Sequence, residues 1–122
     1  MNNRTSQVQK QDNQFIHPWD NFQNLGNNQR TVVEKGDGIY IYDSQGNRLI
    51  DGPSGMWCVN IGHGREEMAQ AIYDQVMQLP FTSPWSMATS PAAQFSQALA
   101  AEAPGDLNHA FLTTCGSTAV DS

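Results

Sequence analysis

The stretch that decides the fold lies near the end of the printed sequence: His109-Ala110-Phe111-Leu112-Thr113-Thr114-Cys115-Gly116-Ser117-Thr118-Ala119-Val120. Its first part is a short apolar run with β character, and its last part can begin a helix. Between them, Gly116 allows a ligand to approach the backbone closely. The free N–H groups of a helix start, with the hydroxyls of Ser117 and Thr118, favour a bound anion such as phosphate. A capped turn without a ligand is the alternative interpretation.

Composition and charge argue against several classes of protein. The 122 residues suffice for one modest domain, and six basic against twelve acidic residues give a net charge of -6. A nucleic-acid groove or an anionic membrane surface requires a basic footprint, so neither partner is expected. No apolar run approaches the roughly 20 residues of a membrane span. P-loop and dinucleotide-binding glycine patterns are missing.

The cysteines and the first residues favour a cytoplasmic protein. Cys58 and Cys115 are not spaced like a metal-binding or redox pair, and two cysteines are too few for a disulfide scaffold, so no metal site is expected. The first residues lack the apolar core of a secretory signal. Residues 1–14 are polar and rich in Asn and Gln, which predicts a disordered tail.

An aromatic segment follows this tail. Trp19 and Phe22 are three residues apart, as on one face of a helical turn that starts after Pro18. The segment is interpreted either as an arm that docks on the core or as part of a pocket wall or subunit contact.

Residues 31–51 predict a small antiparallel meander. Strands are expected at 31–34, 39–43 and 48–51, because the middle one alternates aliphatic and aromatic residues and glycine-containing turns separate the three. A glycine-rich loop over residues 52–64 then carries apolar side chains. Its Trp57 is expected either in the core or in a pocket wall, and its His63 is expected to form a local hydrogen bond rather than to act as a catalyst.

Two helices are predicted in the rest of the chain. The first runs from about residue 65 to 79 and stops at Pro80. A loop over residues 81–89 carries Trp85, and the second helix starts at Ser90-Pro91. The terminal strand would lack a parallel neighbour among the earlier elements, so we expect more chain to follow.

Taken together, these segments resemble the N-terminal quarter of a class III aminotransferase, a pyridoxal-phosphate enzyme of fold type I. The resemblance covers residues 17–122 and depends on the order and spacing of several short motifs. They are His17-Pro18-Trp19, Gly38-Ile39-Tyr40-Ile41-Tyr42-Asp43, Gly46-Asn47-Arg48-Leu49-Ile50-Asp51, Ser54-Gly55-Met56-Trp57-Cys58-Val59-Asn60-Ile61-Gly62-His63-Gly64-Arg65, Ala103-Pro104-Gly105-Asp106-Leu107-Asn108-His109 and Gly116-Ser117. The segment around Trp57 is most similar to enzymes that pass amino groups from amines or ω-amino acids to pyruvate.

The resemblance implies an α/β fold. Residues 15–80 would be the N-terminal segment of the small domain, with the antiparallel meander and a helix. Residues 81–122 would supply a loop, a helix and the first strand-loop-helix of the large domain that binds the cofactor, pyridoxal 5'-phosphate.

The resemblance also implies roles for single residues. Gly116, Ser117 and Thr118 would hold the cofactor phosphate. Four aromatic residues would line or border the substrate pocket, at an active site on a homodimer interface: Trp57, Trp85, Trp19 and Phe22.

Two features depart from the family. Its usual Gly-Ser-Glu-Ala-Asn-Asp reads Gly116-Ser117-Thr118-Ala119-Val120-Asp121 here, so an acid is replaced by Thr118. The reaction also requires a Schiff-base lysine and a carboxylate for the pyridinium nitrogen. The only lysines, Lys10 and Lys35, are not placed like a desolvated catalytic amine, so no catalytic residue is assigned in this chain.

The leading hypothesis is therefore an N-terminal part of an aminotransferase that acts on a small-molecule amine and a keto acid and is not catalytically competent alone. The alternatives are a non-catalytic remnant that serves as an interaction module and a phosphate-binding module.

Overall fold

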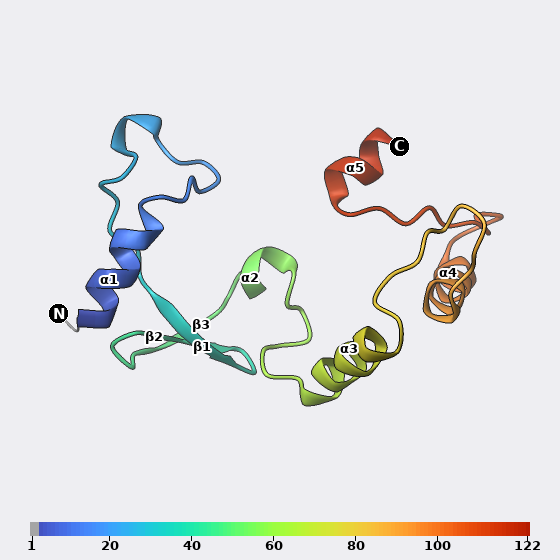
Figure 1. The fold of residues 1–122 in the computed structure, drawn as a ribbon, viewed down its shortest axis with the longest axis horizontal. Helices are drawn as coiled ribbons and strands as arrows, with labels where there is room; N and C mark the ends of the chain where they lie inside the picture. The colour runs from blue at the N-terminus through green and yellow to red at the C-terminus, as the bar shows by residue number, and fades with distance from the viewer. Residues whose placement is uncertain (1–2) are drawn as a thin grey trace. The chain divides into compact units, whose positions relative to one another are not determined.

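The computed structural model describes residues 3–122 as two compact units (Figure 1), one ending at Ala71 and the other covering Ile72–Ser122. In chain order the elements are α1 (Asn3–Asp12), the 3₁₀ turn η1 (Phe22–Asn24), β1 (Val33–Asp37), β2 (Tyr40–Asp43), β3 (Arg48–Ile50), α2 (Ser54–Trp57), α3 (Glu66–Gln78), α4 (Ser90–Glu102) and α5 (Gly116–Asp121). The division falls inside α3, whereas the predicted boundary lies after Pro80.

The predicted meander is confirmed as an antiparallel sheet in the order β1-β2-β3. Asp37 pairs with Tyr40, so a two-residue turn joins the first two strands, and Gly38 takes the positive φ of 55° that this turn requires. In the second turn the Asp43 carboxylate accepts backbone N–H bonds from Gln45 and Asn47, at 2.9 and 2.8 Å. These contacts fix the register locally.

The structure corrects the prediction of a disordered tail, because residues 3–12 form the helix α1. Three side-chain contacts attach this helix to the segments around the sheet. Arg4 pairs with Glu34 at 2.8 Å, Thr5 bonds to the Ser44 hydroxyl at 2.8 Å, and Gln9 donates to a backbone carbonyl at 3.0 Å. The composition of the segment did not reveal these partners, which lie 21 to 39 residues away in sequence.

The aromatic segment also differs from its prediction. Trp19 has a φ of 60°, so a helical turn does not begin after Pro18. The turn η1 begins at Phe22 instead, after Asn21, whose side chain accepts the Gln23 N–H at 3.0 Å.

The two predicted helices are confirmed as α3, which crosses the division between the units, and α4, which lies in the second unit. Residues 110–112 do not form the predicted strand and are irregular. The one sheet found within residues 3–122 lies in the first unit, so no neighbouring strand of the second unit offers a ladder of hydrogen bonds to them. The predicted helix start at Gly116 is confirmed as α5.

Apolar side chains are poorly covered in both units. Within residues 3–122 no hydrophobic side chain is buried, and Thr5 is the one buried polar residue. The apolar stripe of α3, which includes Met68, Ile72 and Val76, is exposed along its length. None of the helices among these residues is long and apolar enough to span a membrane.

Candidate functional site

The first candidate site is the start of α5, in the second unit. Cys115 precedes the helix in an extended conformation, and the Ala119 N–H makes the first helical bond to its carbonyl, at 3.0 Å. The N–H groups of Gly116, Ser117 and Thr118 therefore lie ahead of the helical ladder. A methyl group added at Gly116 would meet no heavy atom within 4 Å, so a ligand has open access to this backbone.

The electrostatics of this turn favour an anion. Thr118 Oγ1 lies 3.2 Å from Cys115 Sγ. This hydrogen bond lowers the pKa of the Cys115 thiol, and the backbone N–H groups of Thr118 and Ser117 lower it further. The same groups that stabilise a thiolate can thus receive a phosphate oxygen. Within residues 3–122, no cluster of side chains suited to a metal ion is found.

The second candidate region is the loop after β3, in the first unit. The helix α2 is a left-handed turn, because Ser54, Gly55, Met56 and Trp57 have φ values of 51°, 57°, 61° and 65°. Left-handed backbone costs a residue with a side chain roughly 1–2 kcal/mol. Ser54, Met56 and Trp57 are therefore strained, and such strain is concentrated at functional sites.

An aspartate and a histidine hold the ends of this loop. Asp51 Oδ2 lies 2.8 Å from His63 Nε2, which confirms the expected local hydrogen bond of His63. That bond lowers the pKa of Asp51, and the N–H of Gly55 lowers it further. Gly36 is necessary beneath the ring, because a Cβ there would lie 2.5 Å from His63 Cγ.

A third group of charges shapes the aromatic segment. Arg30 bonds to Asp12 at 3.2 Å and also pairs with Asp20. His17 Nε2 lies 2.8 Å from Asp12 and, ahead of other causes, lowers the pKa of that carboxyl group. The segment that carries Trp19 is thereby tied back to α1 and to the strand β1 that follows Arg30.

The four predicted pocket residues are exposed. The exposed fractions are 77% for Trp57, 85% for Trp19, 72% for Phe22 and 96% for Trp85. Trp57, Trp19 and Phe22 belong to the first unit, and Trp85 belongs to the second. Core packing, one of two interpretations weighed for Trp57, is therefore not found within residues 3–122.

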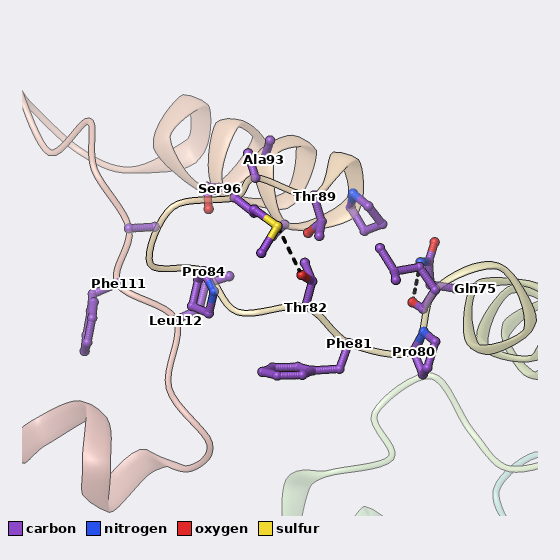
Figure 2. Close-up of a pocket in the computed structure, with 16 residues that line it drawn as sticks. Gln75, Pro80, Phe81, Thr82, Pro84, Thr89, Ala93, Ser96, Phe111 and Leu112 are labelled. Carbon is purple, nitrogen blue, oxygen red and sulfur yellow. Dashed lines mark hydrogen bonds between the residues drawn. The ribbon is translucent and has the colours of Figure 1, made fainter.

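Sequence reasoning missed an apolar groove of about 630 Å³ in the second unit (Figure 2). Its walls come from the end of α3, the loop after it, the first turns of α4 and residues 110–112. The Thr82 hydroxyl donates to the Met87 sulfur at 3.7 Å. Figure 2 shows α4 above the loop that carries Thr82. Gln75 is the residue of α3 in this lining, so the apolar stripe of that helix did not indicate the groove, which depends on how the loop turns back.

Comparison with known proteins decides the family. The sequence pattern of the family described as Aminotransferase class-III matches residues 22–122. This chain belongs to the class III aminotransferases. A putrescine–pyruvate aminotransferase of Pseudomonas aeruginosa is 39% identical over 108 residues, which cover 88% of this chain and 24% of the relative. The chain thus spans about a quarter of the length of the curated relatives it matches.

Solved structures agree with this assignment. A transaminase from the marine bacterium Virgibacillus is 34% identical with a TM-score of 0.86, covering 94% of this chain and 28% of the other. The omega transaminase of Pseudomonas jessenii in complex with PMP is 29% identical with a TM-score of 0.86, covering 93% and 26%. The fold is that of the N-terminal part of a fold type I transaminase, a family of enzymes that depend on pyridoxal 5'-phosphate.

Proposed function

We propose that residues 1–122 are the N-terminal part of a pyridoxal-phosphate aminotransferase that transfers an amino group from an amine or ω-amino acid to a keto acid such as pyruvate. The match to the family over residues 22–122 carries this proposal. The names of two similar proteins support the substrate class. The curated relative is a putrescine–pyruvate aminotransferase, and the solved structure from Pseudomonas jessenii is an omega transaminase.

Gly116, Ser117 and Thr118 are the residues that would hold the cofactor phosphate. The open space over Gly116 and the N–H groups that lower the pKa of Cys115 fit an anionic group there. Thr118 already bonds to Cys115, so the Ser117 hydroxyl is the more accessible of the two donors. When bound, the cofactor ring supplies the electron sink for amine chemistry; the role of these residues is to orient the ring through its phosphate.

Trp57 would contribute a wall of the substrate pocket, and the family resemblance implies a role at that pocket for Trp19, Phe22 and Trp85 as well. Large exposed aromatic rings exclude water from an amine chain when they close over it. A tryptophan-to-glycine variant of a thermostable omega transaminase, among the similar structures, was engineered for the synthesis of enantiopure bulky amines. That substitution supports the idea that a tryptophan in such a wall limits the size of the amine.

The lysine that reacts with the cofactor is expected outside residues 1–122. Lys35 is exposed, lies 3.9 Å from Asp37 and sits over the Tyr42 ring at 5.4 Å, so it is not placed like the desolvated lysine of a Schiff base. Lys10 lies in the last turn of α1, remote in sequence from Gly116, Ser117 and Thr118, which would hold the cofactor phosphate. Residues 1–122 alone are therefore proposed to be inactive.

A cytoplasmic homodimer belongs to the same proposal. The groove of the second unit and the exposed aromatic residues present apolar surface that a longer chain or a second subunit would cover. Cys58 and Cys115 are free and exposed, as suits a reducing compartment.

The test is cofactor binding by the full-length gene product. We expect the purified protein to show the absorbance of bound pyridoxal phosphate, to lose it with an amine donor and to regain it with pyruvate. Ser117→Ala should weaken cofactor retention about tenfold, since it removes one charge-assisted hydrogen bond. Ser6→Ala, on the exposed side of α1, is the matched control. A gene product with neither the absorbance nor the exchange would refute the proposal and favour an interaction module.

A further inference from the structure

The left-handed turn of α2 requires something to hold it. Two helix-type backbone bonds lie within the turn, from the Trp57 N–H to the Pro53 carbonyl at 2.8 Å and from the Cys58 N–H to the Ser54 carbonyl at 3.1 Å. Three of its residues nevertheless carry side chains in left-handed backbone. Strained backbone persists only where its surroundings over-determine it. The contacts at the start of the turn therefore act together with these bonds to set the backbone that carries Trp57.

Asp51 makes two of these contacts. Its carbonyl accepts the Ser54 N–H at 3.1 Å, and its Oδ1 accepts the Gly55 N–H at 3.2 Å. Its other carboxylate oxygen bonds to His63 at 2.8 Å. One side chain thus joins the beginning of the loop to its end. The Asp51 side chain is only 9% exposed, so water competes little for it.

The sheet in turn fixes His63. Its backbone forms a two-bond bridge with Gly38, with N–O distances of 2.8 and 3.0 Å. Its ring lies over Gly36 so closely that no larger residue fits beneath it. The position of the imidazole is therefore set by β1 and the turn after it. Asp51 bonds both to this imidazole and to the Gly55 N–H, so it connects the sheet to the left-handed turn.

We propose that Asp51, supported by His63 over Gly36, is a positioning residue that holds the left-handed turn and thereby fixes the Trp57 ring that limits the size of the amine substrate. The substrate part of this inference depends on the proposed function, whereas the positioning part does not. Because the Trp57 side chain is 77% exposed, side-chain packing within its own unit does not fix the ring.

The first test follows the Trp57 ring directly. The full-length gene product is labelled with 5-fluorotryptophan, and the Trp57 resonance is assigned in the ¹⁹F spectrum as the one lost in Trp57→Phe. We expect Asp51→Ala to shift or broaden that resonance, and Asp51→Asn, which keeps an acceptor oxygen, to restore it largely. An unchanged resonance in Asp51→Ala would overturn the proposal.

A second pair of variants tests the support without changing a polar group. Gly36→Ala places a Cβ against His63 and should disturb the Trp57 resonance in the same way. Gly52→Ala is the matched control, because its Cβ would meet nothing within 4 Å and its φ is not in the left-handed region. Equal effects of the two would also overturn the proposal. If Asp51→Ala folds poorly, the comparison of Gly36→Ala with Gly52→Ala still decides, because it changes no polar group.

The substrate part is tested by kinetics. Asp51→Ala should change the ratio of kcat/KM between a bulky amine and a short one by about tenfold or more, through KM rather than kcat, as expected for a displaced pocket wall. An unaltered ratio with an altered Trp57 resonance would refute the specificity role. Absence of transamination in the parent protein would instead refute the proposed function, while the ¹⁹F comparison would still decide on the positioning role.

Discussion

The two units of this chain obtain their shape in different ways. In the first, polar side chains connect segments that are distant in sequence: Arg4 reaches Glu34, Arg30 reaches Asp12, and His63 reaches Asp51. In the second, the named contacts are short in sequence, such as Gln75 to Leu79 and Thr82 to Met87. Its helices carry apolar faces instead, and these remain exposed. The first unit thus specifies much of its own conformation, whereas the second requires another surface.

The largest expected effect concerns residues 1–122 expressed alone. With no buried hydrophobic side chain within residues 3–122, little apolar area is available to offset conformational entropy. We expect self-association in sedimentation experiments, binding of a hydrophobic dye and no sharp thermal transition. A monomer that melts cooperatively would show that the second unit folds without another surface, and the proposed difference between the two units would then be wrong.

The groove of the second unit provides the next test, in the full-length gene product. Ala93 lines the groove on α4, whereas Gln97 on the same helix does not. If another surface covers the groove, Ala93→Asp buries an unpaired charge and should lower the free energy of unfolding by about 2–3 kcal/mol. Gln97→Asp, the matched control, should change it little. Similar denaturant midpoints for the two variants would indicate that the groove stays open to water.

The first unit should respond to acid through Asp51. Its pKa in the folded chain lies below 3.8, mainly because of the His63 hydrogen bond, so its stabilising contribution is present above that value. The contribution disappears as the pH falls through the lower, folded-state pKa. The difference in melting temperature between the parent protein and Asp51→Asn should therefore be fully present above about pH 5 and shrink below about pH 4.

Asp37→Asn is the control for this titration, because its carboxylate belongs to an exposed ion pair with Lys35. A melting-temperature difference for Asp51→Asn that stays constant between pH 6 and pH 3 would contradict the linkage to Asp51.

The same contrast explains what the sequence could predict. Period-2 alternation and turn residues predicted the meander, and proline and the apolar stripe predicted α3 and α4, because these signals are local. The helix α1 was missed because its stabilising partners, Glu34 and Ser44, lie far along the chain. Residues 110–112 were predicted as a strand from their apolar character, but a strand requires a neighbour that residues 3–122 do not offer them.

The sites divide in a similar manner. The helix start at Gly116 was predicted, because it depends on neighbouring residues. A hydrogen bond of His63 was predicted as well, but not its partner Asp51, which lies twelve residues away. The left-handed conformation of Ser54, Met56 and Trp57 was not, since only Gly55 among the four residues signals a positive φ. The Asp51 side chain, which we propose holds this turn, bonds to Gly55 and to His63, and no sequence pattern identifies that pair of partners.

The smallest expected effect is also the most specific to this turn. Met56 has a φ of 61°, so Met56→Gly removes left-handed strain at a residue that is 49% exposed and has little packing to lose. In the full-length gene product we expect a gain of about 1 kcal/mol in the free energy of unfolding. Gly55→Ala should act with the opposite sign and similar size, because its φ is 57° and the added Cβ would lie 3.1 Å from Val59 Cγ2. The two substitutions are at adjacent positions, and one introduces a glycine where the other removes one. A general change in solubility or expression would not raise the free energy of unfolding in one variant and lower it in the other. If both variants destabilise the protein equally, the turn is not under the strain that its backbone angles indicate, and the holding role assigned to Asp51 would lose its physical basis.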